Sequence, residues 1–149
     1  LMPTGGYSSE TFAYGAVDNL RGTGKTLVIY ALYDFDRSGE DAALSLKEKV
    51  ERFGAEFDVP VQFHQLGLSY YQVHDLNLPT RPAKRASVAD QRWPYEFAAE
   101  LDAIPPDTIR EMVREAIENH LPSWELRTLK RIEAEERKTL LSIANAGTS

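Results

Sequence analysis

The sequence contains no cysteine, so neither a disulfide framework nor a thiolate metal site can form. Its three histidines, His64, His74 and His120, do not have the spacing of a metal-ligand set. No apolar run approaches the ~20 residues that cross a membrane, and no signal peptide is apparent. We therefore expect no membrane-embedded segment, and the cytoplasm is the default location.

Basic residues are also too few for a protein whose whole surface binds nucleic acid. The chain has 17 Lys and Arg against 23 Asp and Glu, a formal net charge of −6. A general phosphate-binding surface needs clustered Lys and Arg, so the composition excludes a basic domain. The exception is one loop-like segment that holds Arg81, Lys84, Arg85 and Arg92, with Asp90 as its only acid. This distribution is compatible with a local basic patch.

Length and composition predict a single domain with a buried core. The chain has 149 residues, of which 42% are apolar and 27% charged, as is ordinary for a globular domain. Apolar periodicity and turn residues predict strands that alternate with helices, which is typical of a parallel α/β sheet with helices on both faces. In chain order we predict a strand tail at 2–6, a helix from Ser8 or Ser9 to about Leu20, a strand at 27–33, a helix at 38–53 that ends at Gly54, a strand at 59–66, a short helix at 69–76, a long loop at 78–100, a helix at 105–121 and a final helix at 124–144.

Two aspartates follow directly on the strand predicted at 27–33. Asp34 and Asp36 are one residue apart, so on extended backbone they point to the same side, with Cα atoms roughly 7 Å apart. The carboxyl ends of parallel strands are where open α/β sheets place their sites. Two carboxylates this close repel each other unless a cation neutralises them, and hard oxygen ligands suit Mg²⁺.

This pair predicts a metal site. The alternative is a strand end whose acids lie at a helix N-terminus, where the helix dipole favours negative charge. The metal site is the favoured interpretation, because Asp34 follows a run of apolar residues and an unpaired buried carboxylate is costly.

A second pair of acids has the same spacing. Glu100 and Asp102 lie ahead of Pro105 and Pro106, where a helix is predicted to begin. On spacing alone they are more simply acids at the start of that helix, a position that the dipole also favours.

Four segments in order resemble a known family. The pattern Asp-x-Asp-x-Ser-Gly at 34–39 is similar to that of Toprim domains, the metal-dependent module of topoisomerases, bacterial primases and several nucleases. More specifically, the chain resembles the bacterial and phage proteins whose Toprim region is similar to that of the topoisomerase VI A subunit. The resemblance spans nearly the whole chain and is carried by residues 5–9, 33–39, 78–84 and 100–106.

The resemblance implies a Toprim-like, Rossmann-like parallel sheet with a C-terminal helical extension. Residues 1–100 would form the Toprim-like α/β domain without its first strand, and 101–149 would form helices packed on it. The family's glutamate at the end of that earlier strand, a general acid/base or metal ligand, has no match in this chain. Its position would precede Leu1, as would the separate domain that carries the nucleophilic tyrosine of topoisomerase VI-type enzymes, so we expect this chain to be inactive alone.

The resemblance also implies a ligand set. Asp34 and Asp36 would hold Mg²⁺ or Mn²⁺, and Glu100 and Asp102 gain standing as second-site acids beside their structural interpretation. The basic residues of the 78–84 segment and its neighbour would contact the backbone phosphates of DNA; they are Arg81, Lys84 and Arg85.

Three functions are compatible with these residues. The first is a Toprim-like domain of a DNA-processing protein with Mg²⁺-dependent phosphodiester chemistry or nucleic-acid binding in the parent protein. The second is a non-catalytic assembly or regulatory module of the same fold, for which an oligomer stays open. The third is a haloacid-dehalogenase-like phosphatase, with Asp34 as nucleophile and Asp36 as acid/base, although Ser38 stands where that motif has Thr or Val.

Overall fold

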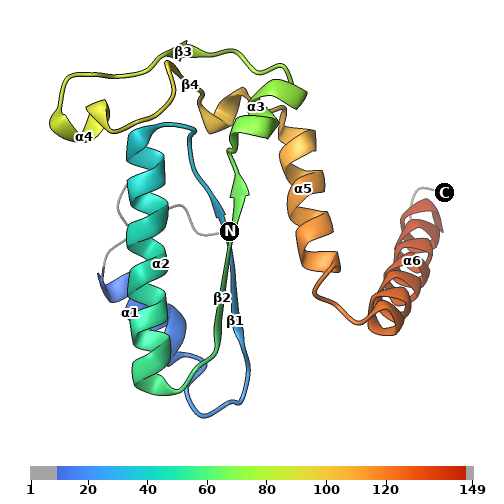
Figure 1. Cartoon of the computed structure of the whole chain (residues 1–149). Coiled ribbons are helices and arrows are strands. Elements are labelled where there is room, and N and C mark those ends of the chain that lie inside the picture. The colour runs from blue at the N-terminus through green and yellow to red at the C-terminus, as the bar shows by residue number, and fades with distance from the viewer. Residues whose placement is uncertain (1–9, 147–149) are drawn as a thin grey trace. The chain divides into compact units, whose positions relative to one another are not determined.

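The computed structural model describes residues 10–146 of the chain (Figure 1). The chain divides into two compact units, residues 1–109 and 110–149. The strand tail predicted at 2–6 lies outside the described residues. The elements are α1 (Glu10–Asp18), β1 (Leu27–Leu32), α2 (Arg37–Phe57), β2 (Val61–Gly67), α3 (Tyr70–Asp75), β3 (Arg81–Pro82), α4 (Val88–Gln91), β4 (Phe97–Ala98), the 3-10 helix η1 (Leu101–Ala103), α5 (Pro106–Glu118) and α6 (Ser123–Ala146).

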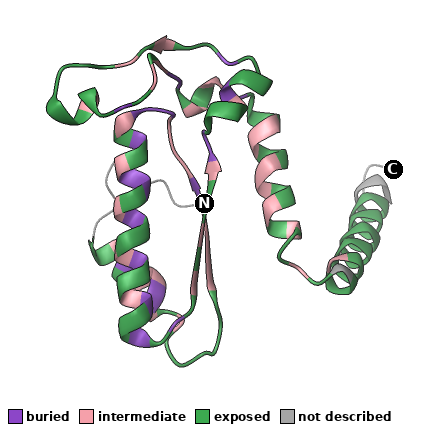
Figure 2. Cartoon of the chain, in the orientation of Figure 1, coloured by how far each residue is buried: buried purple, intermediate pink, exposed green. Residues whose placement is uncertain are grey.

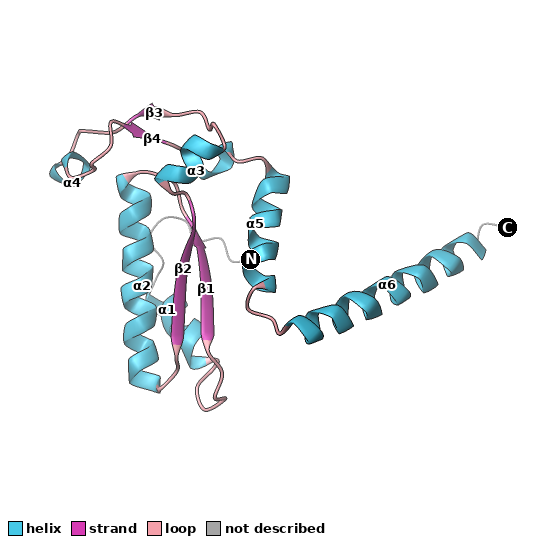
Figure 3. Ribbon diagram, turned by 45° about the vertical axis from the view of Figure 1, so that its right-hand side comes forward, coloured by secondary structure: helices cyan, strands magenta, loops and turns pink. Residues whose placement is uncertain are grey.

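The first unit is a mixed α/β structure built on a parallel pair of strands. β1 and β2 pair from Leu27 opposite Val61 to Leu32 opposite Gly67, and α2 connects them (Figure 3). The α/β class and the parallel pairing are confirmed. A second pair, β3 with β4, is antiparallel and lies with α3 beyond the carboxyl ends of the parallel strands (Figures 1 and 3).

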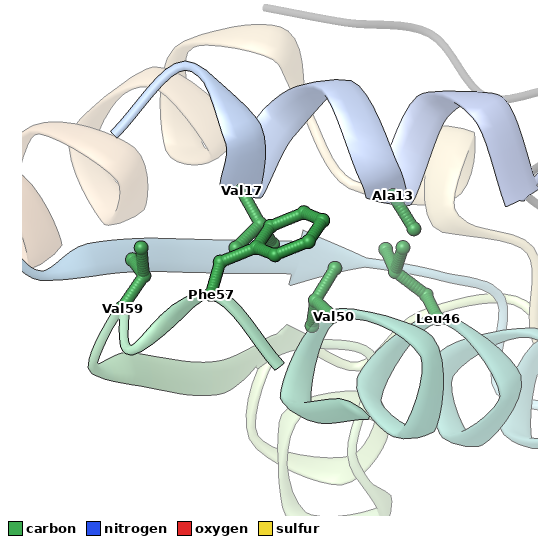
Figure 4. Close-up of a cluster of buried hydrophobic side chains, with 6 residues drawn as sticks. All are labelled: Ala13, Val17, Leu46, Val50, Phe57 and Val59. Atoms are coloured by element: carbon green, nitrogen blue, oxygen red, sulfur yellow. The ribbon is translucent and has the colours of Figure 1, made fainter. Parts of the chain in front are cut away.

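The core lies between the helices α1 and α2 and one face of the parallel pair. Its buried members interdigitate in Figure 4, where Val17 and Val50 are fully buried. Alternate strand residues such as Ile29 and Phe63 pack against this cluster, as expected of a single face of a sheet. Figure 2 shows the buried positions of α2 along one side of that helix. Helical cover on the other face stays a prediction. The buried cluster consists of Ala13, Val17, Leu46, Val50, Phe57 and Val59.

The prediction that the helix after β1 ends at Gly54 is wrong. The helix α2 continues to Phe57, and its C-cap is Asp58, which adopts the left-handed conformation with φ of 56°. Gly54 is needed for packing, because a Cβ at this position would come within 2.6 Å of the Val61 side chain and 2.8 Å of the Val59 carbonyl oxygen. The glycine therefore permits the helix and the following strand to approach closely.

The long loop predicted at 78–100 contains three short elements that were not predicted. Arg81 and Pro82 pair with Ala98 and Phe97 to form the β3–β4 ladder, and α4 begins at a Ser87 capping box between them. Strands this short carry too few residues for an alternating pattern to appear in the sequence.

The second unit contains the rest of α5 and the whole described part of α6. Glu118 and Lys130 join the two helices by an ion pair of 2.8 Å. The two C-terminal helices are confirmed with shifts of a few residues at their ends, and the packing of this extension on the first unit stays a prediction. Among residues 10–146, no helix combines the length and the apolar character that crossing a bilayer requires.

Two glycine substitutions test the packing of the first unit. We expect Gly54→Ala to lower the free energy of unfolding by roughly 1–3 kcal/mol, because its methyl group overlaps Val61 and Val59. The matched control is Gly15→Ala in α1, where an added Cβ meets nothing within 4 Å. This change should stabilise the protein by about 0.5–1 kcal/mol through helix propensity. Urea denaturation measures both, and equal effects would contradict the close approach at Gly54.

Candidate functional site

The turn between β1 and α2 is joined to a distant segment by one β-bridge. Phe35 donates its backbone N–H to the Ala99 carbonyl at 2.8 Å, and Ala99 donates back to Phe35 at 3.1 Å. This bridge places Glu100 and Leu101 beside Asp34 and Asp36. The prediction that the carboxyl end of β1 carries the acid pair is confirmed in position, and a further acid joins it there.

Asp36 is the N-cap of α2 and is nearly buried. Its Oδ1 accepts the Gly39 backbone N–H at 2.8 Å, and the residue is 9% exposed. The helix was predicted to begin at residue 38, but it begins at Arg37, with Asp36 as its N-cap. Position 39 requires glycine for steric reasons, because a Cβ there would lie 2.2 Å from the Asp34 carbonyl oxygen. The Asp-x-x-Gly part of the motif therefore serves the helix start.

Asp34 has an environment that disfavours its charge. Burial raises the pKa of its carboxyl above the ordinary value of 3.8, and the negative charges of Glu100 and Asp36 raise it further. The Leu101 backbone N–H, which donates to Asp34 Oδ1 at 2.7 Å, acts in the opposite direction. The net pKa shift is upward, as expected where a half-buried carboxylate lies among other acids.

Arg81 is the cation of this acid cluster. From β3, its Nη2 donates to Asp36 Oδ2 at 2.8 Å, while its Nε donates to Glu100 Oε1 at 2.5 Å. The guanidinium thus bridges two carboxylates that lie 45 and 19 residues away along the chain. Arg81 was predicted to contact DNA phosphates, and the structure gives it carboxylate partners within the protein.

The other predicted site residues lie around this cluster. Lys84 is exposed and lines a cavity of about 10 Å³ together with Asp36 and Arg81, space for about one water molecule. Asp102 is exposed on η1, and its role as a second-site acid stays a prediction. Among the predicted site residues, the structure brings together Asp34, Asp36, Glu100 and Arg81.

Arg85 forms hydrogen bonds within its own loop. Its guanidinium donates to the carbonyl oxygens of Trp93 at 2.7 Å and Tyr95 at 2.8 Å, and it also contacts Glu96 at 3.3 Å. These bonds satisfy backbone acceptors that a loop would otherwise leave to water. A phosphate contact by Arg85 would have to compete with them.

An aromatic cluster surrounds Phe35, the residue between the two aspartates, and was not predicted from the sequence. Phe35 is buried and its ring centroid lies 4.9 Å from those of both Trp93 and Tyr95. Tyr70 stacks on Tyr95 with centroids 5.3 Å apart, which ties α3 to this cluster. Trp93, Tyr95 and Phe97 lie close together in the sequence, and this concentration of aromatic residues is the signal that could have predicted a shared cluster.

Comparisons with known proteins add no relative to this description. No family model matches the chain, and neither the curated proteins nor the solved structures include a match.

The donor atoms of the site have the chemistry of ligands for a divalent metal. Asp34, Asp36 and Glu100 supply carboxylate oxygens, which are the ligands that Mg²⁺ and Mn²⁺ prefer. As arranged between residues 10 and 146, however, no three acidic or histidine side chains form a metal-holding group. Arg81 binds oxygens of Asp36 and Glu100 that a metal would need. The chemistry of the donors fits, and their present partner is a guanidinium.

Two substitutions at Asp36 separate its two structural roles. Asp36→Asn retains an oxygen for the Gly39 N–H but loses the charge opposite Arg81, so we expect a loss of about 1–2 kcal/mol in the free energy of unfolding. Asp36→Ala also removes the cap and should cost about 1 kcal/mol more. Urea denaturation in EDTA measures both values. If the two variants are equally stable, the cap contributes nothing.

The raised pKa of Asp34 predicts a pH-dependent stability. In a carboxyl whose folded pKa is raised, the stabilising contribution is fully present below the unfolded pKa, near 3.8, and is lost as pH rises through the folded pKa. Asp34→Asn retains an acceptor for the Leu101 N–H and cannot ionise. We therefore expect the stability of this variant relative to the wild type to increase with pH above about 4.

The measurement is urea denaturation of both proteins in EDTA across the acid range to neutral pH. The difference between the two curves removes the contributions of groups that both proteins share. A difference that stays constant with pH would contradict the assigned shift.

Proposed function

We propose that this chain is a Toprim-like domain of a DNA-processing protein in which Asp34, Asp36 and Glu100 bind Mg²⁺ or Mn²⁺. The observation that carries the proposal is the Phe35–Ala99 bridge, because it brings a third carboxylate to the pair at the end of β1. The raised pKa of Asp34 is further support, since perturbed carboxyls are common where a cation binds.

The local structure around the motif supports the Toprim-like part of the proposal. A parallel strand, the acid pair and a glycine that admits the helix close to the strand end follow one another in the order of the resemblance. The site lies at the carboxyl end of a strand–helix–strand unit, the usual position in open parallel α/β sheets.

The residues can be assigned parts in phosphodiester chemistry. When bound, the metal would supply neutralisation of the charge that develops on the phosphodiester. Asp34, Asp36 and Glu100 would hold that metal, and Lys84, which is exposed, would contact a neighbouring phosphate. The glutamate that the family carries on an earlier strand has no match in this chain, so the proposal covers metal and DNA binding and leaves bond cleavage to the parent protein.

A second candidate function is supported by the same arginine. Because Arg81 already forms ion pairs with both Asp36 and Glu100, these two carboxylates have a cationic partner without a metal. The chain would then be a non-catalytic assembly or regulatory module of the same fold. The haloacid-dehalogenase-like alternative stays a prediction.

Metal titration distinguishes these two functions. We expect the chain to bind Mn²⁺ or Mg²⁺ in calorimetry, and we expect Asp34→Asn and Asp36→Asn each to weaken binding by about tenfold or more through loss of a charged ligand. Asp58→Asn is the matched control, because it removes the same charge at an exposed C-cap where Asn also tolerates positive φ. Absence of metal binding in the folded wild-type protein would overturn the metal site and leave the non-catalytic module.

A further inference from the structure

Arg81 is the positively charged partner of the acid cluster, which consists of Asp34, Asp36 and Glu100. We propose that Arg81 is an exchangeable internal counter-ion, which competes with the divalent metal for Asp36 and Glu100 and must leave before the metal binds all three acids. This inference rests on the proposed metal site and adds a mechanism that controls its occupancy.

The first argument is the use of the Asp36 oxygens. Oδ1 caps α2 through Gly39, so a metal that took this atom would remove the helix cap. Oδ2 is the other ligand atom, and Arg81 binds it at 2.8 Å. Because the Asp36 side chain is only 12% exposed, there is little room for a second cation at the same oxygen. Metal and guanidinium are therefore mutually exclusive at Asp36.

The second argument is that the arginine can leave. The Arg81 side chain is 31% exposed and extends from β3, a strand of only two residues. Its other partner, Glu100, is 47% exposed, so this half of the bridge is accessible to water and to ions. An ion pair as exposed as Arg81–Glu100 contributes little net stability, because water solvates both separated groups well.

The third argument concerns charge. A divalent ion interacts with each carboxylate twice as strongly as a monovalent guanidinium at the same distance and dielectric. It would also neutralise Asp34, which lies half-buried beside the segment that carries Glu100. The guanidinium bonds given above reach Asp36 and Glu100, and Asp34 gains no such bond from Arg81. A metal bound to all three acids would therefore interact with Asp34 as well, whereas Arg81 forms ion pairs with Asp36 and Glu100.

Exchange of this kind links the metal to phosphate. Once displaced, the Arg81 guanidinium is available for a phosphate group, and Lys84 lies on the same cavity. Any ligand that holds Arg81 in its displaced position must strengthen metal binding, and the metal must strengthen that ligand's binding by the same factor. Arg81 would therefore couple DNA-phosphate binding to metal binding.

The test compares three variants by their affinity for Mn²⁺ alone, measured by the electron paramagnetic resonance signal of the free ion. Arg81→Gln removes the competitor, so Mn²⁺ should bind about tenfold or more tightly than in the wild type. Lys84→Gln removes the same charge from the same cavity without breaking the bridge, and its effect should stay below about threefold because an exposed charge is screened. Arg81→Lys retains the charge but loses the bidentate bridge, and its affinity should lie between these two.

Melting curves by circular dichroism show whether each variant is folded. Arg81→Gln leaves Asp36 without its ion-pair partner, so its melting temperature should fall without metal and recover on addition of Mn²⁺. If this variant does not fold, Arg81→Lys still tests the proposal, since its affinity must exceed that of the wild type.

The outcomes separate this inference from the proposed function. Mn²⁺ binding by the wild type that is unchanged or weakened in both Arg81 variants would overturn the counter-ion and leave the metal site intact. Equal strengthening in Arg81→Gln and Lys84→Gln would also overturn it, because the effect would then be general charge removal. Absence of binding in every folded variant would overturn the metal site and the inference together.

Discussion

The two backbone hydrogen bonds between Phe35 and Ala99 determine where the charged groups of this protein meet. They fix a residue of the β1–α2 turn to the segment that follows β4, so that Glu100 and the Leu101 N–H face the two aspartates. The same bridge buries the Phe35 ring among the aromatics of α3 and the 93–97 segment. The aromatic cluster buries the Phe35 side chain, and the bridge aligns the two acids beside Phe35 with the segment that begins at Ala99. Because this bridge holds Asp36 and Glu100 close together, a single guanidinium, that of Arg81, can bind both.

The acids of the site are also parts of the scaffold, which ties local stability to any chemistry performed there. Asp36 begins the helix that carries much of the core, and Gly39 lets that helix start against the Asp34 carbonyl. Helix capping and ion pairing hold the Asp36 carboxylate in one orientation, and a ligand group must be held to within about 0.5 Å of its working position. A cation that took both oxygens of Asp36 would loosen the helix start. The geometry thus leaves Asp36 one oxygen for exchange and keeps the other for the fold.

The sequence predicted the elements that its own periodicity defines. The apolar run of β1, the amphipathic pattern of α2 and the acid pair between them are local signals, and the structure contains all three. The partners of the acids are not local. Arg81 reaches Asp36 from 45 positions away through a strand of two residues, and no pattern in the sequence encodes this pairing. Gly54 was misinterpreted for a related reason, because its role depends on Val61 in the next strand. Contacts between segments, rather than propensities within them, account for both errors.

Asp34 is the residue that distinguishes a functional site from a structural one. The cap on α2 and the pair with Arg81 account for a carboxylate at position 36, but neither requires one at position 34. The hydrogen bond from the Leu101 N–H could be accepted equally well by the side-chain oxygen of an asparagine, without the burial of a charge among other acids. A carboxylate that raises the free energy of the folded state at neutral pH, where a neutral isostere would serve the fold, is typical of positions retained for binding or chemistry. The metal hypothesis therefore depends more on Asp34 than on Asp36, although Asp36 is the one that forms the ion pair with Arg81.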